Sequence, residues 1–184
     1  MRRLLLLASI LLTAPGCLVV AVNPSHDRDS LVSEPGLVGE WQNVDDASSM
    51  KIERGEWQSY TVEYAHTIEK GRLTGYLSTI GKERYLDVMP ARGEDHGSFL
   101  LPLHVVLRVR LDADRLELAP LSYDWFFDRV QKKTAIPGLN VVLDEKENAL
   151  IVSSTAALRA WIARQPATAR SVGPAAVFVR KKAG

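Results

Sequence analysis

A run of strict alternation between residues 101 and 111 constrains the fold of this chain more than any other feature. Hydrophobic residues fill the six odd positions, Leu101, Leu103, Val105, Leu107, Val109 and Leu111. Alternation with a period of two is typical of a β-strand that buries one face. We therefore expect a long strand with its odd positions in the core. The other face carries His104, Arg108 and Arg110 and should face solvent or line a polar cavity.

Shorter segments with strand character lie on both sides of this run, separated by turn-forming residues. We expect strands at 37–43, 50–54, 57–66, 72–80 and 84–89 before it, and at 115–119, 140–143, 149–153 and 175–180 after it. Because strands that follow one another closely tend to pair as hairpins, the economical topology is an antiparallel meander.

Two helices are expected in the C-terminal half. Ser122 is a suitable N-cap for the first, with Asp124 in its first turn and Lys132 in its last. Ser154 or Thr155 can cap the second, which should end before Pro166. The predicted fold class is α+β: an antiparallel β-meander, either a twisted sheet or an open barrel of about nine or ten strands, with two helices.

The N-terminus has the pattern of an export signal. Arg2 and Arg3 precede an uncharged, Leu-rich run over residues 4–14, as in a secretory signal peptide. The run ends in Ala14-Pro15-Gly16-Cys17, which resembles the lipobox of bacterial lipoproteins. The resemblance implies cleavage before Cys17, a diacylglycerol thioether on its sulfur and acylation of the new N-terminus. Lipidation would also account for the single cysteine of the chain.

This resemblance predicts three segments: a signal peptide at 1–16, a lipidated tether at 17–36 and a single β-rich domain at 37–184. Leu18 at the second position of the mature chain favours sorting to the periplasmic face of the outer membrane in a host with two membranes. Two alternatives remain, an uncleaved anchor over residues 4–22 and a secreted product cut after Ala21. Each of the three places the domain outside the cytoplasmic membrane.

A second resemblance is confined to one short stretch. Gly39-Glu40-Trp41 stands on the first expected strand of the meander and is similar to the Gly-X-Trp signature of lipocalins. The resemblance implies a tryptophan that closes one end of a barrel.

Composition and motifs exclude several function classes. With 23 Lys and Arg against 22 Asp and Glu, the net charge of +1 favours no nucleic-acid partner. No phosphate loop, dinucleotide fingerprint, nucleophile elbow or zinc-binding helix is present, and no histidine pair has metal-ligand spacing. We therefore expect no cofactor and no metal.

The leading hypothesis is a lipid-anchored envelope protein whose β-rich domain binds a small apolar or anionic ligand or an envelope protein. Candidate ligand contacts are Trp41, Tyr64, Tyr76, His104, Arg108 and Arg110. Trp125 lies off the apolar stripe of the first helix and could serve a partner surface. One alternative is an envelope hydrolase that uses His104 or His96 with Asp87; another is a structural or assembly accessory of the envelope. His26 falls in the expected tether and receives no role.

Overall fold

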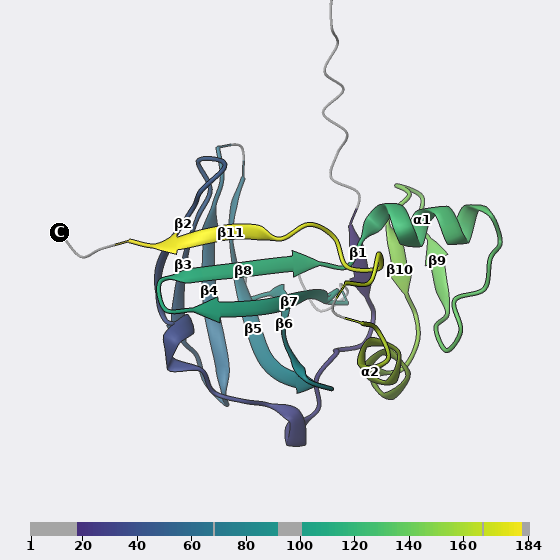
Figure 1. The fold of residues 1–184 in the computed structure, drawn as a ribbon, viewed down its shortest axis with the longest axis horizontal. Helices are drawn as coiled ribbons and strands as arrows, with labels where there is room; N and C mark the ends of the chain where they lie inside the picture. The colour runs from purple at the N-terminus through teal and green to yellow at the C-terminus, as the bar shows by residue number, and fades with distance from the viewer. Residues whose placement is uncertain (1–17, 68, 92–100, 167, 182–184) are drawn as a thin grey trace, which may run out of the picture.

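The computed structural model describes residues 18–67, 69–91, 101–166 and 168–181 (Figure 1). Eight antiparallel strands close into a barrel, and a three-stranded sheet with two helices packs beside it. The predicted α+β class, the antiparallel meander and the two C-terminal helices are confirmed. The barrel is closed, because the last strand pairs with both the first and the seventh strand of the meander.

The first seven barrel strands are neighbours in chain order. The eighth follows only after the two helices and two strands of the small sheet. The eight strands are β2 (Gly39–Asn43), β3 (Ser49–Arg54), β4 (Ser59–Ala65), β5 (Lys70–Ile80), β6 (Glu83–Pro90), β7 (Val105–Asp112), β8 (Arg115–Pro120) and β11 (Ala176–Arg180). In β11, Phe178 lies opposite Asn43 on one side and Leu116 on the other. Closure gives every barrel strand a hydrogen-bonded neighbour on both sides and leaves the barrel no edge strand.

The barrel interior is a packed core. An eight-stranded barrel is just wide enough for its inward side chains to fill it. The buried members of this cluster are Leu37, Trp41, Ile52, Tyr60, Val62, Leu77, Leu86, Val88, Val109, Leu116, Leu118 and Phe178. Trp41, Leu77 and Leu116 are completely inaccessible to solvent. These side chains occupy the space that a ligand-binding barrel would leave open.

The alternating run behaves as predicted only from residue 105 onward, where β7 begins. Val109 is buried in the interior cluster, and Val105, Leu107 and Leu111 pack against it. Leu101 and Leu103 are 78% and 39% exposed, so their predicted place in the core is wrong. They precede the first ladder pair of β7, which joins Val105 to Val88, and have no barrel strand beside them.

The small sheet consists of β1 (Val19–Ala21), β10 (Ala149–Ile151) and β9 (Val141–Leu143). Its central strand, β10, is parallel to β1 and antiparallel to β9. The helices α1 (Tyr123–Gln131) and α2 (Thr155–Ala163) cover it (Figure 1). Ser122 and Ser154 cap them as predicted, because each hydroxyl accepts a hydrogen bond from a first-turn backbone N–H.

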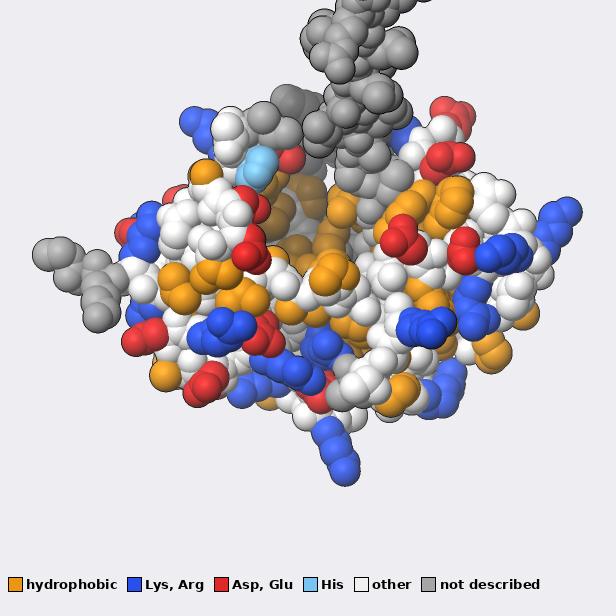
Figure 2. All heavy atoms as spheres, turned by 45° about the horizontal axis from the view of Figure 1, so that its top comes forward, with side chains coloured by type: hydrophobic (Ala, Val, Ile, Leu, Met, Phe, Trp, Pro, Cys, Tyr) orange, Lys and Arg blue, Asp and Glu red, His pale blue; other side chains and the backbone are white. Residues whose placement is uncertain are grey.

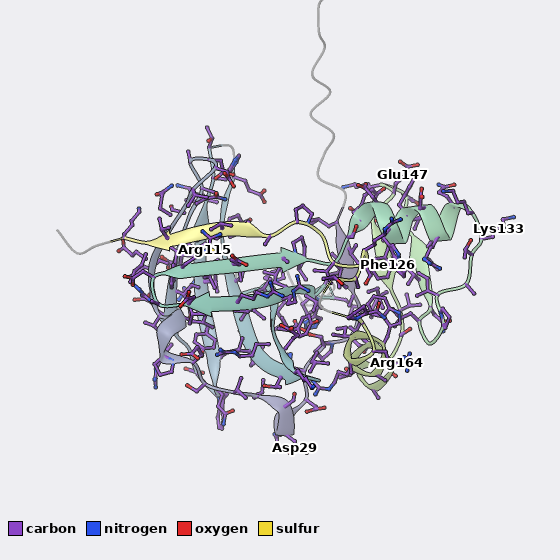
Figure 3. The ribbon with its side chains drawn as sticks, viewed as in Figure 1. Asp29, Arg115, Phe126, Lys133, Glu147 and Arg164 are labelled. Atoms are coloured by element: carbon purple, nitrogen blue, oxygen red, sulfur yellow. The ribbon has the colours of Figure 1, made fainter. Side chains whose placement is uncertain are left out.

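A second core lies between this layer and the outside of the barrel. Phe126 of α1 points toward the sheet and α2 (Figure 3) and lies 5.5 Å from Trp161, measured between ring centroids. Tyr85 and Val106 belong to the same cluster and come from the outer face of β6 and β7. One face of the barrel is therefore buried on both sides.

The segment before β2 lies along the barrel and contains two short 3-10 helices, η1 (Arg28–Ser30) and η2 (Pro35–Leu37). Backbone bridges join Ala21 to His104 and Leu31 to Ser78. Over residues 18–36 this packing differs from the tether expected at 17–36, since Val19, Val20 and Ala21 form a buried strand. Within the described chain, no helix combines the length and hydropathy needed to span a bilayer.

Candidate functional site

The most unusual group in the molecule is the carboxylate of Asp87, which is completely buried on the outer face of β6. In register, Asp87 lies between Tyr76 of β5 and Val106 of β7. An acidic side chain on this face would meet water in an isolated barrel. Here the segment over residues 20–32 covers it, and a buried carboxylate is retained only with partners.

Both oxygens of Asp87 have partners. Oδ1 lies 2.6 Å from Nδ1 of His104. Oδ2 accepts hydrogen bonds from the backbone N–H of Ser25 at 2.5 Å and from its hydroxyl at 2.8 Å. Nδ1 of His26 lies 3.5 Å from the same oxygen, at ion-pair distance and without hydrogen-bond alignment. We call Ser25, His26, Asp87 and His104 the Asp87 network.

These contacts hold Asp87 in its charged form. Burial alone would raise the pKa of its carboxyl group. The hydrogen bond with His104, the approach of His26 and the Ser25 N–H outweigh burial and lower the pKa to about 2. Asp87 is therefore a carboxylate at every physiological pH.

His104 connects this carboxylate to the small sheet. Its backbone N–H donates to the carbonyl of Ala21 at 2.9 Å, and its carbonyl accepts from the Ala21 N–H at 2.8 Å. His104 as a whole is 7% exposed. The sequence predicts that the face carrying His104 meets solvent or lines a polar cavity. At His104 this prediction is wrong, because β1 covers the residue.

His26 connects the network to the surface. Its ring stacks on Tyr76, with centroids 4.4 Å apart and planes inclined by 23°. His26 and Tyr76 both line an open hollow of about 490 Å³ on the outer surface of the barrel. One face of the Tyr76 ring therefore packs on His26, which lies against Asp87. Tyr76 also lines the hollow, so it is part of an accessible surface.

Arg159 of α2 holds the same N-terminal segment from the other side. Its Nη1 donates to the carbonyl of Ser25 at 2.9 Å and to the hydroxyl of Ser30 at 3.0 Å. Its Nε lies 3.1 Å from Oδ2 of Asp27, and Nη2 donates to the carbonyl of Thr79 on β5 at 3.3 Å. One guanidinium thus joins α2, the N-terminal segment and the barrel.

The predicted ligand contacts lie in separate places. Trp41 is in the barrel interior, where its Nε1 donates to the Leu37 carbonyl and the Arg180 guanidinium lies 4.2 Å from its ring centroid. The hydroxyl of Tyr64 donates to Glu69 at 2.9 Å. Of the six predicted residues, only Tyr76 and His104 lie beside Asp87.

The two predicted arginines lie on the outward-facing side of β7. Arg108 is half-buried and Arg110 is exposed. Trp125, expected at a partner surface, packs 5.9 Å from Trp161 between ring centroids, with Arg129 over its own ring at 4.3 Å. Figure 2 shows acidic and basic side chains interspersed over one face of the molecule, as the small net charge indicates.

The residues of the hydrolase alternative meet in part. Asp87 and His104 come together, whereas His96 and the predicted lipidation site Cys17 lie outside the described residues. The Ser25 hydroxyl donates to Asp87, not to a histidine, so the network lacks the order of a nucleophile, base and orienting acid. Among the described residues, no group of three or more His, Cys, Asp or Glu side chains is arranged to hold a metal ion.

Sequence reasoning missed Ser25 and His26. The available signal was Asp87 itself, a lone acid between Leu86 and Val88 in an expected strand. Aspartate is depleted in strands, and a buried one requires partners. Nothing in the sequence indicated that the partners come from residues 25 and 26, more than sixty positions away.

No known relative helps to interpret this site. Protein-family models, curated proteins and solved structures contain no match to this chain. A barrel fold alone does not specify a function, so the chain's own residues are what indicate one.

Proposed function

We propose that this protein is a lipid-anchored lipoprotein of the cell envelope whose barrel is a non-catalytic binding domain that acts through its outer surface. The signal-like N-terminus and the lipobox resemblance at Cys17 support the anchor. An up-and-down barrel of eight strands is an architecture that lipocalins also have. The Gly39-X-Trp41 resemblance agrees with that architecture, but it does not indicate which ligand the protein binds.

The observation that carries the proposal is the filled interior of the barrel. Small-molecule sites are usually concave spaces of about 300–1,000 Å³ that enclose most of the ligand. The twelve buried side chains of the interior cluster fill the corresponding space here. A binding function then belongs on the outer surface, where the described residues line open hollows.

The Asp87 network favours a structural role over the hydrolase alternative. Its carboxylate is fully buried, and its partners come from two separate stretches of the chain. A general base needs a substrate proton within hydrogen-bond reach, and both Asp87 and His104 lie beneath the N-terminal segment. The network instead fixes that segment to the barrel.

The anchor and the domain would be close together. The strand β1 begins at Val19, so Leu18 alone separates it from Cys17. A lipid on Cys17 would hold the small sheet and the barrel at the membrane surface, without an intervening tether.

Metabolic labelling with radioactive palmitate tests the anchor. We expect label in the wild-type protein, and neither label nor processing in Cys17→Ser. Leu18→Ala is the matched control, because it alters the neighbouring residue and keeps the sulfur. Equal labelling of wild type and Cys17→Ser would contradict the proposal, as would recovery of the wild-type protein in the soluble fraction.

A further inference from the structure

The turn between β3 and β4 presents a tryptophan to solvent. Trp57 is 87% exposed, the highest value among the large hydrophobic residues that the structure describes as exposed. Most tryptophans bury a large apolar area, as Trp41 and Trp161 do here. The exposed position of Trp57 gives the fold no comparable burial.

The backbone of this turn is also unfavourable for such a residue. Trp57 and Gln58 have φ values of 54° and 65°, and the Ser59 N–H donates to the Glu56 carbonyl at 2.9 Å. Two central residues with positive φ are typical of a type I′ hairpin turn, which favours Asn-Gly. A bulky residue with positive φ is an outlier, and such strain tends to occur at functional sites.

Two hollows flank Trp57, and Tyr76 also lines both of them. The larger, about 790 Å³, lies over the outer face of β4, β5 and β6 and includes Thr61, Thr74 and Met89. The smaller, about 490 Å³, reaches the N-terminal segment at His26 and Leu31. We call the two hollows together the Trp57 groove.

The charge of the groove favours an anionic occupant. Arg54 and Arg72 line the larger hollow and Arg28 the smaller, against one acidic side chain, Glu56. All three arginines are exposed. In the part of the chain that the structure describes, none of them forms an ion pair; Arg72 lies opposite Glu63 in register but makes no salt bridge with it.

The groove is partly fixed in advance. Tyr76 is stacked on His26, and His26 lies against the buried carboxylate of Asp87. A ring held in this way loses little rotamer freedom when a ligand covers its other face. The Asp87 network therefore supports the groove from below.

We propose that the Trp57 groove docks an acidic, extended segment of a partner protein. Tryptophan, tyrosine and arginine are the residues that dominate the energetics of protein interfaces. Unpaired arginines recognise acidic motifs through charge-assisted hydrogen bonds. An acyl chain would need an enclosed apolar space, whereas these hollows are open and contain Thr61, Thr74 and three arginines. The inference deepens the proposed surface-binding function and rests on it.

Selection from a display library of random dodecapeptides, with the full chain in a non-ionic detergent, tests the proposal. We expect the selected peptides to carry clustered Asp or Glu beside an apolar residue, and their affinity to fall as salt rises. Trp57→Asn suits the turn and should keep the fold. It should weaken binding roughly 10- to 30-fold, as loss of an interface tryptophan does.

Arg72→Ala should weaken the same peptides about fivefold, while Arg110→Ala, an exposed strand arginine on β7, should leave them within about twofold. Selected peptides without acidic residues, or equal binding by Trp57→Asn, would overturn the proposal. Phosphatidylglycerol vesicles and a polyuronate are tested in parallel. Tighter, Trp57-dependent binding of either would also overturn it, because the occupant would then be a lipid or a glycan. The palmitate-labelling experiment tests the lipid anchor and does not depend on peptide binding. A failure of the proposed anchor can therefore be distinguished from a failure of the proposed docking site.

Discussion

The carboxylate of Asp87 lies 2.6 Å from Nδ1 of His104, and the backbone of His104 exchanges two hydrogen bonds with Ala21. This pair joins β6 of the barrel to the residue before β7 and, through it, to β1. Ser25 binds the other oxygen of the same carboxylate. One buried charge thus holds three parts of the chain together.

The low pKa of Asp87 predicts a specific dependence of stability on pH. The folded-state pKa is about 2, against an ordinary value of 3.8. A depressed pKa adds stability that is complete above the unfolded value and is lost as pH falls through the folded value. The shift corresponds to about 2 kcal/mol at neutral pH, lost between about pH 4 and pH 2. Urea unfolding at several pH values measures it.

Asp87→Asn isolates this contribution. The variant should be less stable at pH 7, and its stability should change less than that of the wild type between about pH 4 and pH 2. Asp45→Asn serves as the control, since it removes an exposed carboxylate from the turn between β2 and β3. Parallel pH profiles of wild type and Asp87→Asn would refute the role assigned to the network.

Arg159 predicts a local effect on the N-terminal segment. Replacement by Lys keeps the charge and loses the branched donor set, which reaches Ser25, Ser30 and Thr79. Hydrogen bonds to charged groups contribute roughly 1.5–3 kcal/mol, so Arg159→Lys should release this segment before the barrel unfolds. Amide hydrogen exchange should rise over residues 22–32 and stay unchanged in β8. Arg164→Lys, at the C-terminal end of α2 (Figure 3), is the matched control.

Much of the fold follows from local sequence patterns. Turn residues and alternation locate the barrel strands, and Ser122 and Ser154 locate both helix starts, because these signals act between near neighbours. Closure of the barrel by β11 depends on pairing between residues far apart in the chain, such as Phe178 and Asn43. That pairing leaves no local signal.

The candidate site was less accessible to prediction for the same reason. The Asp87 network depends on how residues 18–36 cover the outside of the barrel, and that segment has turn chemistry with no sustained period. Its anchors are single contacts, Ser25 on Asp87 and Leu31 on Ser78. The exposed position of Trp57 likewise depends on backbone angles that its neighbours in sequence do not indicate.

The β3–β4 turn should become more stable when its strain is removed. Left-handed backbone costs a residue with a Cβ roughly 1–2 kcal/mol, and Asn tolerates it better. Trp57→Asn should therefore raise the unfolding free energy by about 0.5–1 kcal/mol. Gln58→Gly removes the same kind of strain without altering the tryptophan and should act in the same direction. A loss of stability in both variants would show that the turn is not strained.

The barrel core and the start of the alternating run should respond differently to truncation. Leu116 is completely buried, so Leu116→Ala should lower the unfolding free energy by roughly 2–5 kcal/mol. Leu101 is 78% exposed, and Leu101→Ala should change it by less than about 0.5 kcal/mol. Thermal or urea unfolding compares the two. Similar losses would mean that Leu101 belongs to the core after all.

The central claim is that the barrel interior is a packed core and that binding takes place outside it. Titration of the full chain with palmitate carrying a ¹³C-labelled carboxyl group, followed by NMR, tests this most directly. We predict only the signals of free and detergent-bound fatty acid, identical for wild type and Trp41→Phe. A saturable protein-bound signal with one fatty acid per chain, altered by Trp41→Phe, would contradict the account.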